Sequence, residues 1–224
     1  MKLGVLLPTF RYGSEDALTF ADEAATAGID GVFAYDHLWP MGSPERPSLA
    51  PFPLLSAIAR RHEELTVGPL VARVSLVGTE HLVEQFETLG ILAPGRVIVA
   101  LGTGDKLSAP ENDAYGLPAL SAEQRRDLLR DAATALVASM PVWIGAGGDA
   151  TNQLARDVGA TINLWDWSPD RVAQMGETGP VCWAGPVPKD LFATLSALQE
   201  AGATWAVLSP DVSINQLREW RSRQ

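Results

Sequence analysis

The chain has 224 residues, of which 46% are hydrophobic, and a formal net charge of −10 at pH 7. This composition supplies one hydrophobic core, and no segment has the character of an interdomain linker, so we expect a single domain over residues 1–224. The acidic balance argues against nucleic acid or an anionic membrane as a partner, since no Lys/Arg cluster offsets the repulsion.

Three signals concern the cell compartment. The single cysteine, Cys182, lies in an apolar run and cannot form an internal disulfide, so nothing indicates an oxidising compartment. The first residues lead straight into a strand pattern rather than a signal peptide. No apolar stretch approaches the ~18 residues of a membrane span. We therefore expect a cytoplasmic protein.

Eight short apolar runs, each followed by a helix-like stretch, occur along the chain. They are rich in Val, Ile, Leu and Trp, as parallel strands buried on both faces should be. The pattern predicts a closed (β/α)8 barrel, or TIM barrel, with its site in the loops that follow the strands. The predicted strands are Leu3–Pro8, Gly31–Asp36, Leu65–Ala72, Arg96–Leu101, Val142–Ala146, Thr161–Asp166, Val181–Gly185 and Trp205–Pro210.

The helices between these strands differ in length. The last four strands begin closer together than the first four, which predicts short second-half helices and small loops on that side. Asp105–Leu120 is the longest connection, with Asn, Gly and Pro punctuation. The predicted helices are Ser14–Ala27, Phe52–His62, Thr79–Leu92, Ala122–Ser139, Thr151–Val158 and Ser213–Arg223.

The strongest candidate for chemistry follows the second strand. Asp36-His37-Leu38-Trp39 places a carboxylate, an imidazole and an indole at the barrel mouth. A histidine there can act as acid, base or hydrogen-bond donor near neutral pH. The alternative is that Asp36 only caps a turn and His37 is merely exposed. His62 and His81 fall within helices and are expected on the surface, and a metal site is poorly supported.

Two glycine-rich turns follow strands four and five. Gly102-Thr103-Gly104 would let backbone amides approach a flat or phosphorylated ligand. Gly145-Ala146-Gly147-Gly148-Asp149-Ala150 fits the G-x-G-x-x-A form, so a Rossmann-type site is a rival interpretation. Against it stand the position in the fifth βα unit and the short helix that follows. Glycines needed only for tight turns remain a further alternative.

Each of the last four strands carries one indole, from Trp143, Trp165, Trp183 and Trp205. Large apolar side chains usually fill space, so core packing is the default. One or two indoles near the mouth, above all Trp183, could instead face an aromatic cofactor.

Several stretches, in the same order along most of the chain, resemble the luciferase-like monooxygenase family of flavin- and deazaflavin-dependent (β/α)8 enzymes, especially its shorter actinobacterial members. They are Leu3-Gly4-Val5 with Pro8, Tyr35-Asp36-His37-Leu38, Val67–Val74, Pro94-Gly95-Arg96-Val97, Ala100-Leu101-Gly102-Thr103-Gly104, Pro141-Val142-Trp143-Ile144-Gly145 and Trp183-Ala184-Gly185.

The resemblance implies coenzyme F420 or FMN lying across the mouth, a small-molecule substrate, and a homodimer formed through the first-half helices. The cofactor ring would rest near Ala72-Arg73-Val74, on a strand where relatives have a non-prolyl cis peptide, and within reach of Trp39 and Trp183. Gly102–Gly104 would flank the ring, and Gly145–Gly147 would approach the ribityl or phosphate part. His37, with Asp36, would be the catalytic residue, and this pair favours the deazaflavin.

The chain also departs from the family pattern. Only Pro186-Val187-Pro188 stands where relatives have a long insertion before the seventh helix. An oxidoreductase using F420 or FMN is the leading hypothesis, and a non-catalytic flavin-binding or interaction protein is the alternative. An aldolase or hydrolase using Asp36 and His37 directly ranks last, because no strand lysine or carboxylate cluster supports it. The sequence does not decide whether Asp105, Glu111 and Asn112 reach the site.

Overall fold

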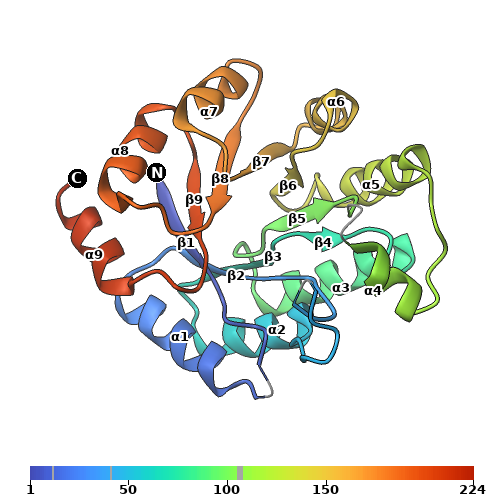
Figure 1. Ribbon diagram of the computed structural model, residues 1–224, viewed down its shortest axis with the longest axis horizontal. Coiled ribbons are helices and arrows are strands. Elements are labelled where there is room, and N and C mark those ends of the chain that lie inside the picture. The colour runs from blue at the N-terminus through green and yellow to red at the C-terminus, as the bar shows by residue number, and fades with distance from the viewer. Residues whose placement is uncertain (12, 41, 105–107) are drawn as a thin grey trace.

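The computed structural model describes residues 1–11, 13–40, 42–104 and 108–224. Its strands form one parallel sheet in the order β3-β2-β1-β9-β8-β7-β6-β5-β4, which curves around a central axis (Figure 1). The predicted (β/α)8 barrel is confirmed, with β3 and β4 as two parts of its third strand. The strands are β1 (Lys2–Leu6), β2 (Gly31–Ala34), β3 (Thr66–Pro69), β4 (Ala72–Arg73), β5 (Val99–Gly102), β6 (Val142–Gly145), β7 (Thr161–Trp165), β8 (Val181–Gly185) and β9 (Trp205–Leu208).

The barrel closes between the third and fourth predicted strands. Val67 in β3 forms a parallel bridge with Val97, and its carbonyl accepts the amide of Ile98 at 3.0 Å. Farther along, Ala72 in β4 pairs with Leu101 in β5. Between the two halves lies Leu70–Val71, whose peptide bond is cis. The non-prolyl cis peptide implied by the family resemblance is therefore present on this strand, just before the residues named for it.

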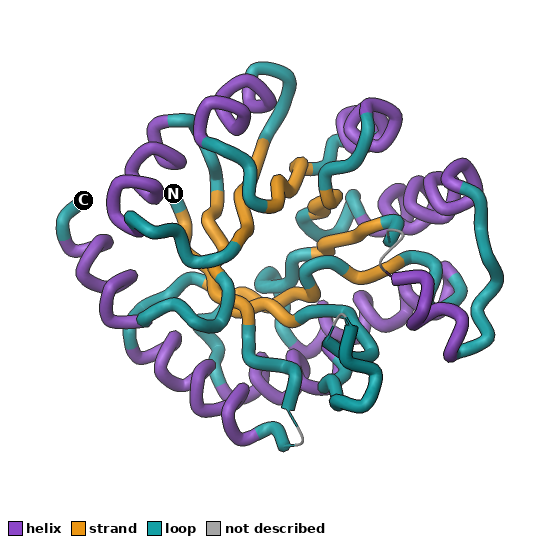
Figure 2. The backbone as a smooth tube through the Cα atoms, in the orientation of Figure 1, coloured by secondary structure: helices purple, strands orange, loops and turns teal. Residues whose placement is uncertain are grey.

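Helices surround the strands as an outer layer (Figure 2). The helix α3 has the predicted bounds, whereas α4 is an additional helix within the long fourth connection. The second-half helices α6, α7 and α8 have nine, eight and ten residues, which confirms the predicted shortening. The helices are α1 (Glu15–Thr26), α2 (Pro51–Arg61), α3 (Thr79–Leu92), α4 (Ala109–Ala114), α5 (Ala122–Leu136), α6 (Asp149–Asp157), α7 (Pro169–Gly176), α8 (Leu191–Glu200) and α9 (Ile214–Ser222).

Two hydrophobic clusters form the core, because side chains alternate across each strand. The larger cluster packs the outer strand faces against the helices. The smaller one fills the barrel, where Trp143 and Trp205 pack against Phe33 with ring centroids 5.4 and 5.8 Å away. These two indoles confirm the core-packing default.

The two helix-borne histidines differ. His81 is exposed, as predicted. His62 is half-buried at the end of α2, where its Nε2 lies 2.7 Å from Asp22, so its predicted surface position was wrong. The carboxylate partner compensates the cost of removing the imidazole from water. No helix in the described ranges is long and apolar enough to cross a membrane.

Candidate active site

A cavity of about 500 Å³ opens at the C-terminal ends of the strands. This is the end at which (β/α)8 barrels build their sites. The first six barrel strands, or the loops that follow them, contribute to it. Its lining residues are Phe10, Tyr35, Asp36, His37, Leu70, Val71, Arg73, Gly102, Thr103, Gly104, Ser108, Gly145, Ala146, Asn163 and Trp165.

Glu111, on α4, is the centre of the polar network beside this cavity. Its Oε1 lies 2.8 Å from His37 Nδ1, and its Oε2 accepts hydrogen bonds from Arg73 Nη2 at 2.7 Å and the Leu38 amide at 3.1 Å. The Glu111 and Arg73 side chains are only 1% and 4% exposed. A buried charge is tolerated when it is paired and hydrogen-bonded. Glu111 and Arg73 give each other both an opposite charge and a hydrogen bond.

The contact with Glu111 orients the His37 ring. A carboxylate beside Nδ1 favours the tautomer that carries its proton there. The other ring nitrogen, Nε2, then has a free lone pair, and the His37 side chain is 25% exposed on the cavity wall. His37 can accept a proton from a ligand bound in the cavity.

Asp36 fixes Arg73 rather than His37. Its carboxylate accepts the Arg73 amide at 2.7 Å, and its carbonyl accepts Arg73 Nε at 2.9 Å. Burial raises the pKa of the Asp36 carboxyl, and the hydrogen bond and charge of Arg73 oppose that shift only in part. Asp36 therefore acts through its geometry, holding the guanidinium that pairs with Glu111.

The glycine turn after β5 is shaped by the neighbouring third strand. A Cβ on Gly102 would lie 2.4 Å from Val71 Cγ2, so only glycine fits without a shift of Val71. Gly104 has φ +69°, a conformation that favours glycine. With Thr103, these residues line the cavity, and their expected contact with a cofactor ring stays a prediction. Gly145 and Ala146 line it too, from the end of β6.

Five predicted cofactor residues lie elsewhere. Ala72 and Val74 are buried in the outer cluster, because they alternate with Arg73 along the strand. Trp183 is also in the outer cluster, and its Nε1 donates to the Trp167 carbonyl. Trp39 does not line the cavity and packs against Tyr115. Gly147 does not line it either, and its amide donates to the Asn152 side chain. The side chains of Ala72, Val74 and Trp183 thus point to the helices, which corrects their expected orientation.

Several lining residues were not predicted. Leu70 and Val71 stand where Ala72 and Val74 were expected, and Trp165 is the mouth indole in place of Trp183. Glu111 reaches the site, whereas Asp105 lies outside the described residues. Among the residues that are described, no three His, Cys, Asp or Glu side chains are grouped as a metal site would require.

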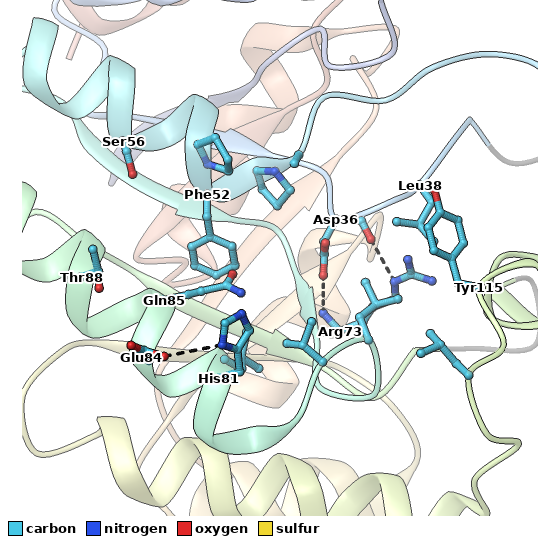
Figure 3. Close-up of a pocket in the computed structure, with 17 residues that line it drawn as sticks. Asp36, Leu38, Phe52, Ser56, Arg73, His81, Glu84, Gln85, Thr88 and Tyr115 are labelled. Atoms are coloured by element: carbon cyan, nitrogen blue, oxygen red, sulfur yellow. Dashed lines mark hydrogen bonds and ion pairs between the residues drawn. The ribbon is translucent and has the colours of Figure 1, made fainter.

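A second cavity, of about 740 Å³, lies between α2 and α3 and shares Asp36 and Arg73 with the mouth (Figure 3). Its lining is mainly apolar and includes Phe52 and Leu82. His37 and Glu111 do not line it. The Asp36–Arg73 pair therefore forms the wall between this groove and the site that holds the imidazole.

Comparison with known proteins places this geometry in a family. Residues 1–140 match the family model described as luciferase-like monooxygenase. An F420-dependent glucose-6-phosphate dehydrogenase of Beutenbergia cavernae is 34% identical over 166 residues, which are 72% of this chain and 47% of the relative. The chain thus spans about half the length of the curated relatives it matches.

Solved structures agree on the fold. An F420-dependent secondary alcohol dehydrogenase in complex with an F420-acetone adduct has a TM-score of 0.80 at 15% identity, with 97% of each chain covered. The coenzyme F420 dependent tetrahydromethanopterin reductase from Methanopyrus kandleri has a TM-score of 0.72 at 11% identity, covering 98% of this chain and 96% of that one. With the Rossmann alternative excluded by the barrel, the chain belongs to the luciferase-like monooxygenase family.

Proposed function

We propose that the protein is an oxidoreductase that binds coenzyme F420 at the barrel mouth, with FMN as the alternative cofactor. The observation that carries this proposal is the hydrogen-bonded series Arg73–Glu111–His37 beside a cavity that Leu70, Val71 and three glycines also line. The names of the relatives, which are F420-dependent dehydrogenases, support the choice of cofactor.

The lining fits a flat ring. Leu70 and Val71 present apolar surface to the cavity, and the Val71 side chain packs closely against Gly102 and Gly145, which have no side chains to displace it. These four residues would hold the ring, and Ala146 would approach its ribityl part. When bound, the deazaflavin accepts or donates a hydride.

The polar residues would handle the proton. In the oxidation of a secondary alcohol, His37 Nε2 would accept the hydroxyl proton, and a bound deazaflavin would supply the acceptor for the carbinol hydrogen with its electron pair, so that both bonds broken to form the carbonyl are accounted for. Glu111 stabilises the imidazolium through Nδ1, and Arg73 keeps the carboxylate in place.

The test separates binding from proton transfer. Titration of the protein with F420 and with FMN, followed by tryptophan fluorescence, should show saturable quenching by F420. The variant His37→Asn should bind F420 within about twofold of the wild type but transfer hydride at least ~100-fold more slowly. His81→Asn, in an exposed histidine of α3, is the matched control and should change neither quantity.

Other results would change the proposal. Quenching by FMN alone would name the other cofactor, and quenching by neither would end the proposal. Tight F420 binding without turnover of any alcohol or ketone would favour the alternative of a non-catalytic flavin-binding or interaction protein.

We also propose that residues 1–224 form one domain, act on a small molecule in the cytoplasm and assemble as a homodimer through the first-half helices. Ile91 on α3 is 80% exposed, so it is the position at which this contact can be tested. Sedimentation velocity should give a dimer, and Ile91→Glu should shift it toward the monomer. A monomer in both cases would refute the assembly.

A further inference from the structure

Three aromatic side chains form a continuous wall on one side of the mouth cavity. The Phe10 and Tyr35 rings stack with centroids 5.4 Å apart and an interplanar angle of 10°. The Trp165 ring meets Tyr35 edge-on, with centroids 6.4 Å apart. We call Phe10, Tyr35 and Trp165 the aromatic wall, and all three line the cavity.

The strand register directs Trp165 toward the mouth. Its neighbour Leu164 is fully buried in the outer cluster, so Trp165 faces the opposite side of β7. Even so, Trp165 is 47% exposed, which is unusual for an indole at the end of a buried strand. The free indole surface offers a place for an apolar ligand to replace water.

The charges around Arg73 disfavour an anionic substrate group at that part of the cavity. Among the described lining residues, the only guanidinium or ammonium group belongs to Arg73, and it donates from Nη2 to the Glu111 carboxylate and from Nε to the Asp36 carbonyl. Its third nitrogen, Nη1, is buried without a hydrogen-bond partner. A substrate phosphate beside Arg73 would therefore meet a guanidinium that is already paired with a carboxylate, in a chain of net charge −10.

Two other cations near the mouth, among the residues that the structure describes, lie outside the lining. Arg11 and Arg46 both donate to the carbonyl of Phe10, and Arg11 is also paired with Asp16. Both arginines are exposed to solvent, where ionic screening weakens their effect. Lys106 lies outside the described residues.

We infer that the substrate of this site is an uncharged alcohol or ketone with a flat ring, held against the aromatic wall, and not a phosphorylated sugar. This inference rests on the proposed function, because it assigns the substrate of the same site. It separates the chain from the Beutenbergia cavernae relative, whose name specifies glucose 6-phosphate. In this arrangement the ring stacks on the wall while the hydroxyl or carbonyl oxygen reaches His37.

Direct binding tests the inference without turnover. Acetophenone, acetone and glucose 6-phosphate are each titrated into the protein, with and without F420, and binding is followed by saturation-transfer NMR. Acetophenone should bind at least about tenfold more tightly than acetone, and glucose 6-phosphate should not saturate. In Trp165→Ala, the dissociation constant of acetophenone should rise about tenfold, while that of F420 should change less than twofold. Tyr115→Ala, which removes an exposed ring outside this cavity, should leave both unchanged.

Each contrary outcome has its own meaning. Tighter binding of glucose 6-phosphate than of acetophenone would overturn the inference, and its loss in Lys106→Ala or Arg46→Ala would locate the phosphate. Weaker F420 binding in Trp165→Ala, with acetophenone unaffected, would overturn it by assigning the wall to the cofactor. If F420 fails to bind at all, the proposed function fails, and the measurement without F420 still decides whether the wall selects a ringed ligand.

Discussion

Replacement of Glu111 by Gln should destabilise the protein, because the amide cannot neutralise Arg73. Both side chains are almost fully buried, and the charge–charge contact between Glu111 Oε2 and Arg73 Nη2 is 2.7 Å. Removing one partner of a buried pair costs about 3–5 kcal/mol, since the other charge stays buried. For a domain of this size, each kcal/mol lowers Tm by roughly 2–4 °C. We therefore expect Tm to fall by about 6–20 °C.

The assay is a double-mutant cycle. Urea unfolding of Glu111→Gln, Arg73→Met and the double variant should give a coupling energy of about 1–3 kcal/mol, because losing both charges leaves none unpaired. Glu84→Gln, in an exposed glutamate of α3, is the control and should stay within about 0.5 kcal/mol of the wild type. If the losses of stability in the two single variants added up in the double variant, with a coupling energy below about 0.5 kcal/mol, the buried ion pair would not be the cause of the destabilisation.

Two further predictions concern the cavity wall. Gly102→Ala places a Cβ 2.4 Å from Val71 Cγ2, so it should lower the free energy of unfolding in urea by about 1–3 kcal/mol and weaken F420 binding. Gly148→Ala is the control, because its Cβ would meet no atom within 4 Å. If both variants lost the same stability and the same F420 affinity, the contact with Val71 would not be the cause. Burial and the charge of Asp211 raise the pKa of Tyr35 from 10.0 to about 12. Folding thus favours the neutral phenol, and this stabilisation is complete below the ordinary pKa and lost as pH rises through about 12. Tyr35→Phe should remove the last step of the phenolate absorbance titration; an unchanged last step would assign it to another tyrosine.

The barrel could be predicted because parallel strands buried on both faces are continuous apolar runs that composition alone reveals. The same property hides which side of a strand faces the barrel axis. In Val181–Gly185, Cys182 and Ala184 face the barrel interior while Trp183 faces the helices, yet all are apolar. Trp183 was therefore assigned to the mouth, although Trp165 lies there.

Glu111 was the hardest site residue to assign from sequence, because a glutamate in a long polar connection is normally solvated. It lies 74 positions from His37, and nothing local to either residue brings them together. The available signal was Arg73, a charged residue at the end of an apolar strand. Buried guanidinium groups need carboxylate partners, so Arg73 required an acid from a neighbouring loop. The adjacent fourth connection offered Asp105, Glu111 and Asp113, and only the fold of that connection selects Glu111. The ion pair thus both anchors the loop and positions the imidazole, so loss of stability and loss of proton transfer should accompany each other in variants of this pair.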